Sequence, residues 1–179
     1  ADHTGEENGI ADLLQALQYK RDLDFSVRNL ELLLDGKSLE PEAQKLLEKT
    51  FTDRKKAREV AENGNMINSG GIVYVQLDKK IESSYFLALI PNAHVILLFG
   101  PHEKNIGNWE VNIRLGMAAP SDLTLSKLKI EDFDPSFGYR WNAGGNSRGT
   151  GSSLDIAEYA QRLNGKLQKF LASKKISAH

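Results

Sequence analysis

Two strand patterns in the middle of the chain constrain the fold more than any other feature. The run His94–Phe99 (His-Val-Ile-Leu-Leu-Phe) is almost continuously apolar, which is typical of a strand that is covered on both faces. Residues 109–115 then alternate between apolar and polar side chains, which is the period of a strand with one covered face. A sheet that contains such strands needs helices packed against it, so the pattern predicts an α/β fold.

The segment before these two runs predicts a small mixed sheet with flanking helices. Residues 71–77 (Gly-Ile-Val-Tyr-Val-Gln-Leu) form a third strand pattern, rich in β-branched side chains. Ser83 or Ser84 can begin a short helix that Pro91 closes. Strand, helix and strand then make a βαβ unit, with the alternating strand beside it.

Apolar residues at helical spacing predict helices before and after the sheet. Asp24 can cap the second helix, which stops at Gly36, and Pro41 marks the start of the third. Asp155, with Glu158 three residues on, opens the last helix as a capping pair. The expected helices cover residues 10–19, 25–34, 41–63, 121–130 and 156–171.

The change from helices to strands divides the chain into two parts. The helical first third carries no residues with visible chemistry, and residues 65–71 form a polar, glycine-bearing joint. We therefore predict an all-helical arm over residues 1–64, followed by an α/β domain over residues 65–179.

Composition excludes several classes of protein. The apolar fraction of 40% suffices for a packed core, and the longest apolar run, residues 93–99, is far too short to span a bilayer. The chain has no cysteine, which excludes disulfides and thiolate metal sites and fits a reducing compartment. No charged start precedes an apolar segment, so no signal peptide is visible. We expect a cytoplasmic protein without a membrane partner.

The formal net charge of −1 hides an asymmetry. Residues 140–179 carry seven Lys/Arg against two Asp/Glu, or +5, so the remainder carries −6. A local basic region suits a phosphate-bearing ligand better than the coating of duplex DNA, which favours a strongly basic domain. The alternative is a solvated last helix with lysines near its end, which the helix dipole favours.

A glycine-rich stretch over residues 137–151 precedes the last helix and holds five glycines and two arginines. Clustered backbone N–H groups beside arginine can form a concave anion site, and the following helix adds the positive end of its dipole. The stretch has neither the Walker order nor the spacing of the dinucleotide fingerprint. An irregular surface turn is the alternative interpretation.

Several side chains of this stretch favour a ligand site. Arg140 and Arg148 are bidentate phosphate donors, and Trp141 and Tyr139 offer stacking faces. Glycine N–H groups could orient a phosphate, and asparagine amides could orient the ligand. The candidates of the stretch are Arg140, Trp141, Asn142, Gly144, Gly145, Asn146, Arg148 and Gly149.

Two motifs resemble one family. Residues 110–114 (Glu-Val-Asn-Ile-Arg) are similar to a family strand that ends in arginine. Residues 137–145 (Phe-Gly-Tyr-Arg-Trp-Asn-Ala-Gly-Gly) look like a variant of its Phe-Gly-Gly-Gly-His-x-x-Ala-Gly loop, without the histidine. With their order along the chain, they resemble the C-terminal substrate-binding domain of DHH phosphoesterases, over roughly residues 70–175. The resemblance implies a phosphate contact for Arg114.

That family includes single-strand exonucleases, enzymes that degrade very short oligonucleotides and cyclic-dinucleotide phosphodiesterases. Its catalytic half is an N-terminal domain whose aspartates and Asp-His-His triplet bind two manganese ions. Here Asp2-His3-Thr4 is the nearest trace, without the second histidine. The resemblance thus implies manganese in a catalytic domain that precedes residues 10–64. We assign no catalytic residue and no metal ligand to this chain. We expect His94 to be a core or strand-end histidine and His102 to be solvated in a turn.

The expected function is the substrate-binding part of a metal-dependent phosphoesterase that acts on phosphodiesters of nucleotides or short oligonucleotides. The expected partner is a phosphate-bearing nucleotide or a short single-stranded oligonucleotide. One alternative is a non-catalytic nucleotide-binding, nucleic-acid-binding or assembly module. A third is a hydrolase that uses carboxylates of this chain, such as Asp132 and Asp134. The sequence identifies neither the substrate nor the oligomeric state, of which a homodimer is one option.

Overall fold

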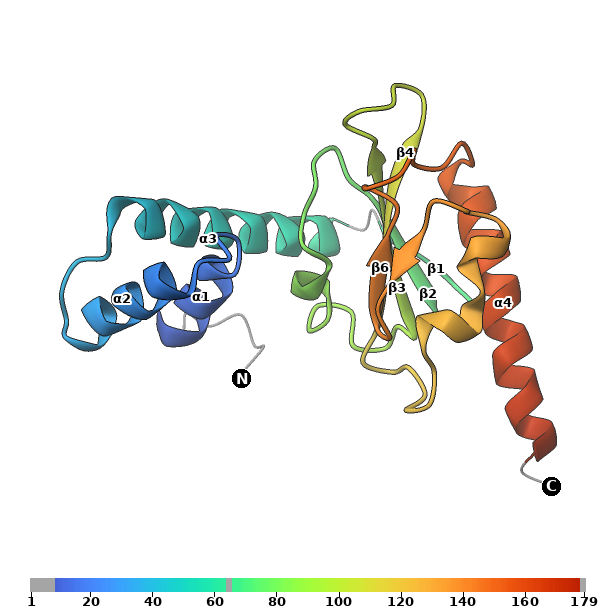
Figure 1. Cartoon of the computed structure of the whole chain (residues 1–179). Helices are drawn as coiled ribbons and strands as arrows, with labels where there is room; N and C mark the ends of the chain where they lie inside the picture. The colour runs from blue at the N-terminus through green and yellow to red at the C-terminus, as the bar shows by residue number, and fades with distance from the viewer. Residues whose placement is uncertain (1–8, 64–65, 178–179) are drawn as a thin grey trace. The chain divides into compact units, whose positions relative to one another are not determined.

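The computed structural model describes residues 9–63 and 66–177, with side chains described up to residue 174 (Figure 1). It divides into two compact units, residues 1–59 and residues 60–179. We call them the helical unit and the sheet unit and describe each by itself. No helix in the described part of the chain combines the length and the apolar character that a membrane crossing requires.

The helical unit is built from the three helices that the sequence predicts, α1 (Gly9–Leu17), α2 (Leu23–Leu34) and α3 (Pro41–Glu62), the last of which runs on beyond the unit. The cap of α2 differs from the prediction. Asp22 rather than Asp24 accepts a hydrogen bond from Phe25 N (3.0 Å), because the helix begins at Leu23, two residues earlier than expected. The buried core of the unit comprises Leu13, Leu17, Phe25 and Ala43.

Buried polar groups tie the helices of this unit together. Asn29 is fully buried, donates to Phe25 O (2.9 Å) and accepts from Glu40 N (2.9 Å), which joins α2 to the segment that leads into α3. The buried carboxylate of Asp12 in α1 forms an ion pair with Arg54 in α3. A buried charge needs such a partner, so these contacts fix how the helices pack.

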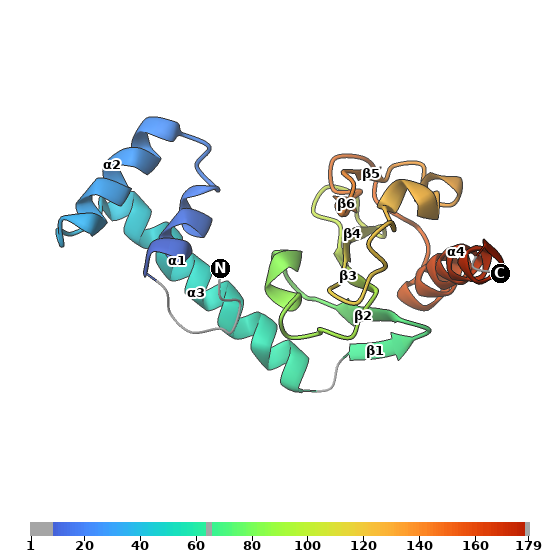
Figure 2. The same ribbon diagram turned by 90° about the horizontal axis from the view of Figure 1, so that it is seen from below.

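The sheet unit contains a six-stranded mixed sheet with the strand order β1-β2-β3-β4-β6-β5, which Figure 2 shows nearly edge-on. β2 and β3 are parallel, and every other neighbouring pair is antiparallel. The strands are β1 (Met66–Ser69), β2 (Ile72–Gln76), β3 (Val95–Pro101), β4 (Trp109–Leu115), β5 (Gly138–Tyr139) and β6 (Ala143–Gly145). The predicted fold class, a small mixed sheet with flanking helices after a helical region, is confirmed.

Two expectations for the connections were wrong. The short helix after Ser83 is a single 3₁₀ turn, η1 (Ser83–Phe86). The helix expected at 121–130 is replaced by two 3₁₀ turns, η2 (Leu125–Leu128) and η3 (Ile130–Asp132). Lys129 between them has a positive φ of 46°, which a continuous helix does not allow.

The expected polar joint contains the edge strand β1. Its partner is β2, and the hairpin turn between them is Gly70-Gly71, with φ values of 61° and 92°. Positive φ at both central residues is the requirement of a type I′ turn, which glycine meets without a steric cost. The four-residue strand was missed because Met-Ile-Asn-Ser is too short to show an alternation.

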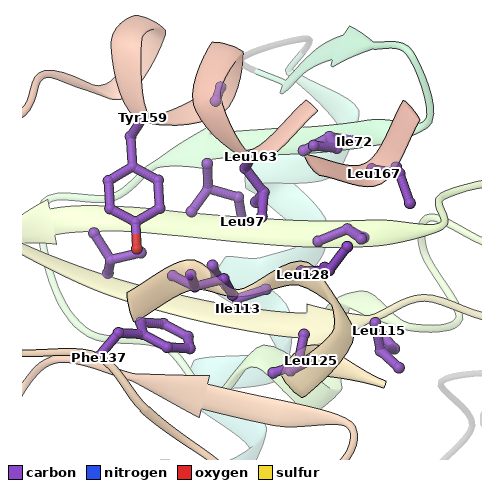
Figure 3. Close-up of a cluster of buried hydrophobic side chains, with 14 of the residues drawn as sticks. Ile72, Leu97, Ile113, Leu115, Leu125, Leu128, Phe137, Tyr159, Leu163 and Leu167 are labelled. Carbon is purple, nitrogen blue, oxygen red and sulfur yellow. The ribbon is translucent and has the colours of Figure 1, made fainter. Parts of the chain in front are cut away.

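The main core lies between one face of the sheet and α4 (Ile156–Ser177), with η2 and η3 closing it at one side (Figure 3). Leu163 and Leu167 of α4 face Leu97 of β3 and Ile113 of β4. All five residues from Val95 to Phe99 are buried, which confirms that β3 is covered on both faces. The labelled core residues are Ile72, Leu97, Ile113, Leu115, Leu125, Leu128, Phe137, Tyr159, Leu163 and Leu167.

Replacing Leu163 by alanine should destabilise the sheet unit by about 2–5 kcal/mol, because the side chain is fully buried and leaves a cavity. Both tryptophans, Trp109 and Trp141, belong to this unit, so urea unfolding followed by tryptophan fluorescence reports its free energy of unfolding. Ile106→Ala is the matched control, since Ile106 is fully exposed. Equal losses in the two variants would contradict the assigned core.

Candidate functional site

The glycine-rich stretch folds as a hairpin of β5 and β6 rather than as an open loop. β6 has a neighbour on each side: Gly144 pairs with Ile113 and Tyr139, and Gly145 pairs with Asn112 and Gly138. Backbone groups of a strand point toward its neighbours. A ligand would therefore meet Gly144 and Gly145 through the faces of the sheet, where these residues carry no side chain.

The register of this hairpin places Arg114 and Arg140 on either side of Ala143. Arg114 pairs with Ala143, and Arg140 N donates to Ala143 O (2.8 Å). Side chains of residues directly opposite each other lie on the same face of a sheet. Arg114, Ala143 and Arg140 thus form one row, on the face that is opposite to the core residue Ile113.

A second row lies two residues along the strands and contains Asn112, Gly145 and Gly138. Together, Ala143, Gly145 and Gly138 leave an area of sheet almost without side chains, which we call the glycine floor. A Cβ on Gly145 would lie 2.7 Å from Asn112 Oδ1 and 2.8 Å from Val111 O, so this position requires glycine. The floor is bordered by Arg114, Arg140 and Asn112.

The guanidinium of Arg114 is held in place by residues that precede and begin η1. Its Nε donates to Ser83 Oγ (3.0 Å), and Glu82 Oε1 lies 3.5 Å from its Nη2. The side chain is largely buried, at 19% exposure. A guanidinium that is already oriented loses less conformational entropy if it binds an anion, which lowers the free-energy cost of binding.

Two further polar side chains of β4 share this face. Glu110 is buried, and Lys80 Nζ lies 2.6 Å from its Oε1. Asn112 Nδ2 donates to the same carboxylate (3.1 Å). Glu110 and Asn112 belong to the 110–114 motif, but no site role was expected for them or for Lys80. The alternation of β4 was the available signal, because positions 110, 112 and 114 must face the same way.

Trp141 and Asn142 form the turn of the hairpin. Trp141 O accepts from Leu125 N (2.9 Å), and Asn142 O accepts from Leu115 N (2.9 Å), so the turn is fixed through its backbone. The side chain of Trp141 is free of the core, with the residue 68% exposed. Its ring is therefore open to contact beside Arg140.

Tyr139 lies on the other face of the sheet. The centroid of its ring lies 6.2 Å from the centroid of the Phe137 ring, and its hydroxyl donates to Glu131 Oε1 (3.3 Å). Loss of water around the phenol, followed by the negative charge of Glu131, raises the pKa of Tyr139, so the hydroxyl stays neutral. Tyr139 cannot stack on a ligand that lies over the glycine floor.

Asn146 is fully buried at the end of β6. Its Oδ1 accepts from Val111 N (2.7 Å), and its Nδ2 donates to Asp134 Oδ2 (2.9 Å) and more weakly to Trp109 O (3.4 Å). The amide thus meets its hydrogen-bonding needs within the protein. These contacts give Asn146 the role of holding the hairpin against β4.

Asp134 is the centre of that buried network. It also accepts from Tyr159 OH (2.9 Å) and Ser136 Oγ (2.8 Å). Burial, and then the charge of Asp134, raise the pKa of Tyr159, which therefore remains a neutral donor. The network connects the hairpin to α4, which carries Tyr159.

Arg148 and Gly149 follow β6 at the end opposite to Arg140. Gly149 N donates to Asn146 O (3.0 Å), and Arg148 is exposed in the turn between them. A Cβ on Gly149 would lie 2.7 Å from Ser136 Cβ. The structure therefore brings Arg114 and Arg140 together and separates Arg148 from both by the length of β6.

No group of three His, Cys, Asp or Glu residues in the described part of the chain could hold a metal ion. Asp132 forms an ion pair with Lys166, whose hydrogen bond lowers the pKa of Asp132, and Asp134 is buried in its network. These two carboxylates do not form a joint site, so the hydrolase that depended on them is not supported. Asp2-His3-Thr4 lies outside the described residues. His102, which was expected to be solvated, is instead buried, and its Nδ1 accepts from Lys104 N and Asn105 N (both 3.2 Å).

The chain is similar to known proteins at the level of three-dimensional structure. No protein-family model matches the chain, and no curated protein matches it. Its structure is similar to that of PggH, a pGpG-specific phosphodiesterase from Vibrio cholerae, with a TM-score of 0.52 and 14% sequence identity. The match covers 83% of this chain and 51% of that one, so the chain spans about half the length of the solved structure. The similarity confirms, at the level of the fold, the resemblance to phosphoesterases that the two motifs suggested.

Asn146→Ala should lower the free energy of unfolding of the sheet unit by about 1–3 kcal/mol, because Val111 N and Asp134 each lose a buried partner. Urea unfolding followed by tryptophan fluorescence measures the loss. Asn92→Ala is the control, since Asn92 is exposed. Unchanged stability of Asn146→Ala would contradict the role given to Asn146.

Proposed function

We propose that the sheet unit is the substrate-binding part of a metal-dependent phosphodiesterase and that it binds a phosphate of a nucleotide or short single-stranded oligonucleotide. The phosphate lies over Ala143, between Arg114 and Arg140. The observation that carries this proposal is the row formed by these three residues, in which two arginines flank a side chain of one carbon.

The chemistry of the row favours a phosphate. A guanidinium presents two parallel N–H donors, which match two phosphate oxygens, and charge-assisted bonds of this kind are stronger than neutral ones. The small residues of the glycine floor let a bulky oxyanion approach the sheet between the two donors. Arg114 is oriented by Ser83 and Glu82, which prepares one side of the site before binding.

Trp141 offers a stacking surface for a base next to this phosphate. Stacking of a base on an aromatic side chain contributes about 1–3 kcal/mol and tolerates any base. The exposed ring adjoins Arg140 in the sequence, so a nucleotide with its phosphate on the arginines has its base within reach of Trp141.

Hydrolysis requires groups that the described residues do not bring together. Two manganese ions need a cluster of carboxylates and histidines, and the described part of this chain contains no such group. We therefore assign substrate binding to this chain and metal-dependent cleavage to another part of the polypeptide. PggH, which shares the fold over about half its length, acts on pGpG, a phosphate-bearing ligand of the proposed class.

The alternative is a nucleotide-binding or assembly module without a catalytic partner. Such a module would bind the nucleotide through the same arginine row, but the complete polypeptide would bind the nucleotide without cleaving it. A titration of the chain with mononucleotides, short oligonucleotides and cyclic dinucleotides, with and without Mn²⁺, tests both. Binding without cleavage by this chain fits the proposal, and cleavage by this chain alone would contradict the assignment of the metal groups to another part.

Arg114→Ala and Arg140→Ala should each weaken binding of a 5′-phosphorylated dinucleotide by about tenfold or more, because each removes a charge-assisted bond to the same phosphate. Each should also flatten the dependence of log K on log salt by roughly 0.7. Isothermal titration at several salt concentrations measures both effects. Lys104→Ala, which changes an exposed cation in the β3–β4 turn, is the control, and equal effects there would refute a specific site.

Arg148→Ala should affect long ligands more than short ones. Arg148 lies beyond the other end of β6, so it reaches only a phosphate that is displaced from the Arg114–Ala143–Arg140 row. We expect a loss of about threefold to tenfold for a tetranucleotide and little change for a mononucleotide. Equal losses for both ligands would place Arg148 in the primary phosphate site instead.

A further inference from the structure

The amide of Asn112 has a defined orientation at the edge of the glycine floor. A carboxylate only accepts hydrogen bonds, so the group of Asn112 that faces Glu110 at 3.1 Å must be the NH₂. Glu110 is itself fixed, since it is buried and paired with Lys80 at 2.6 Å. The amide oxygen of Asn112 therefore points away from Glu110.

That oxygen lies over the floor. A Cβ built on Gly145 would be 2.7 Å from Asn112 Oδ1, which places the acceptor directly above the glycine. Among the residues that the structure describes, none donates a hydrogen bond to this oxygen. The floor thus has donors in one row, Arg114 and Arg140, and an unused acceptor in the next, about 7 Å away along the strands.

We propose that Asn112 Oδ1 accepts a hydrogen bond from the ribose 2′-hydroxyl of the nucleotide that the phosphate on the arginine row joins to the one stacked on Trp141, and that it thereby favours ribonucleotides over deoxyribonucleotides. This inference rests on the proposed function. An ionised phosphate diester has no proton to donate, so an acceptor beside the phosphate site must serve another part of the ligand. The sugar is bonded directly to the phosphate, and its 2′-hydroxyl is the donor that deoxyribose lacks.

The surroundings of Asn112 favour a sugar over a base at this position. The neighbouring positions across the sheet are Gly145 and Gly138, which offer no side chain on which a base could stack. The exposed ring of Trp141 lies in the hairpin turn, on the other side of the arginine row. A base that stacks on Trp141 leaves the glycine row to the sugar of the adjoining nucleotide.

Glu110 is a positioning residue in this arrangement, because it acts through Asn112. A glutamine at position 110 would present both a donor and an acceptor, so the amide of Asn112 could turn over and direct its NH₂ at the floor. Glu110→Gln should therefore reduce the preference for ribose. A purely structural role of Glu110 would change stability but would leave the preference as it is.

The test compares two ligands, the 5′-phosphorylated ribodinucleotide pApA and its deoxy counterpart, on the 179-residue chain by isothermal titration. The parent chain should bind the ribodinucleotide about five- to tenfold more tightly, the value of one hydrogen bond. Asn112→Leu, which keeps the size of the side chain and removes the acceptor, should bring the ratio to about one. Asn68→Leu, a change at an exposed position of β1, is the matched control and should keep the parent ratio.

The outcomes separate this inference from the proposed function. Equal affinities in the parent, or a preference that persists in Asn112→Leu with native circular dichroism, would overturn the role of Asn112. The proposed function would stand in that case if Arg114→Ala still weakened both ligands. Failure of the parent to bind either dinucleotide would overturn both, and an unchanged ratio in Glu110→Gln would remove the positioning role of Glu110.

Discussion

The pairing of β6 between β4 and β5 is the constraint on which the candidate site depends. It aligns Arg140 with Arg114 across Ala143, although the two arginines are separated by 25 residues in the sequence. The alignment is purely a matter of register, because a shift by one residue would turn Arg140 to the core face. The buried amide of Asn146 opposes such a shift, since it bonds to Val111 N only in the observed register.

The same network makes the site a property of the whole sheet unit. Asp134 joins Asn146 to Tyr159, and Tyr159 packs in the core beside Phe99 and Phe133. Partly satisfied buried polar networks are costly, so each member is stable only while the others remain in place. Core packing of α4 and the position of the hairpin are therefore coupled.

The fold was predictable where the sequence patterns are long. Two runs of about six residues located β3 and β4, and helical spacing located α1 to α4, because period and length are read directly from the sequence. The strands β1, β5 and β6 have two to four residues each, and their existence depends on pairing partners that are distant in the sequence. Tertiary contacts, not local propensity, decide such segments.

The candidate site was predictable in part for a similar reason. Composition and the family resemblance pointed to Arg114, Arg140 and Trp141 as ligand contacts, which remains a prediction to be tested. Neither could show that Asn146 is buried or that Tyr139 lies on the face of the sheet opposite to the glycine floor. Both facts follow from the register of a hairpin that was expected to be a loop. For Asn112 the sequence was informative, because the alternation along residues 109–115 predicts that Asn112 lies on the same face of the strand as Arg114.

The glycine floor has an evolutionary consequence. Gly145 admits no larger residue, since a methyl group there would collide with Asn112 and with the main chain of Val111. A larger side chain therefore cannot alter the floor at Gly145, and ligand preference beside this position changes through the residues at its border. Divergence of specificity among proteins that share this hairpin should accordingly concentrate at the outward positions of β4 and in the two-residue turn, while Gly145 itself stays fixed.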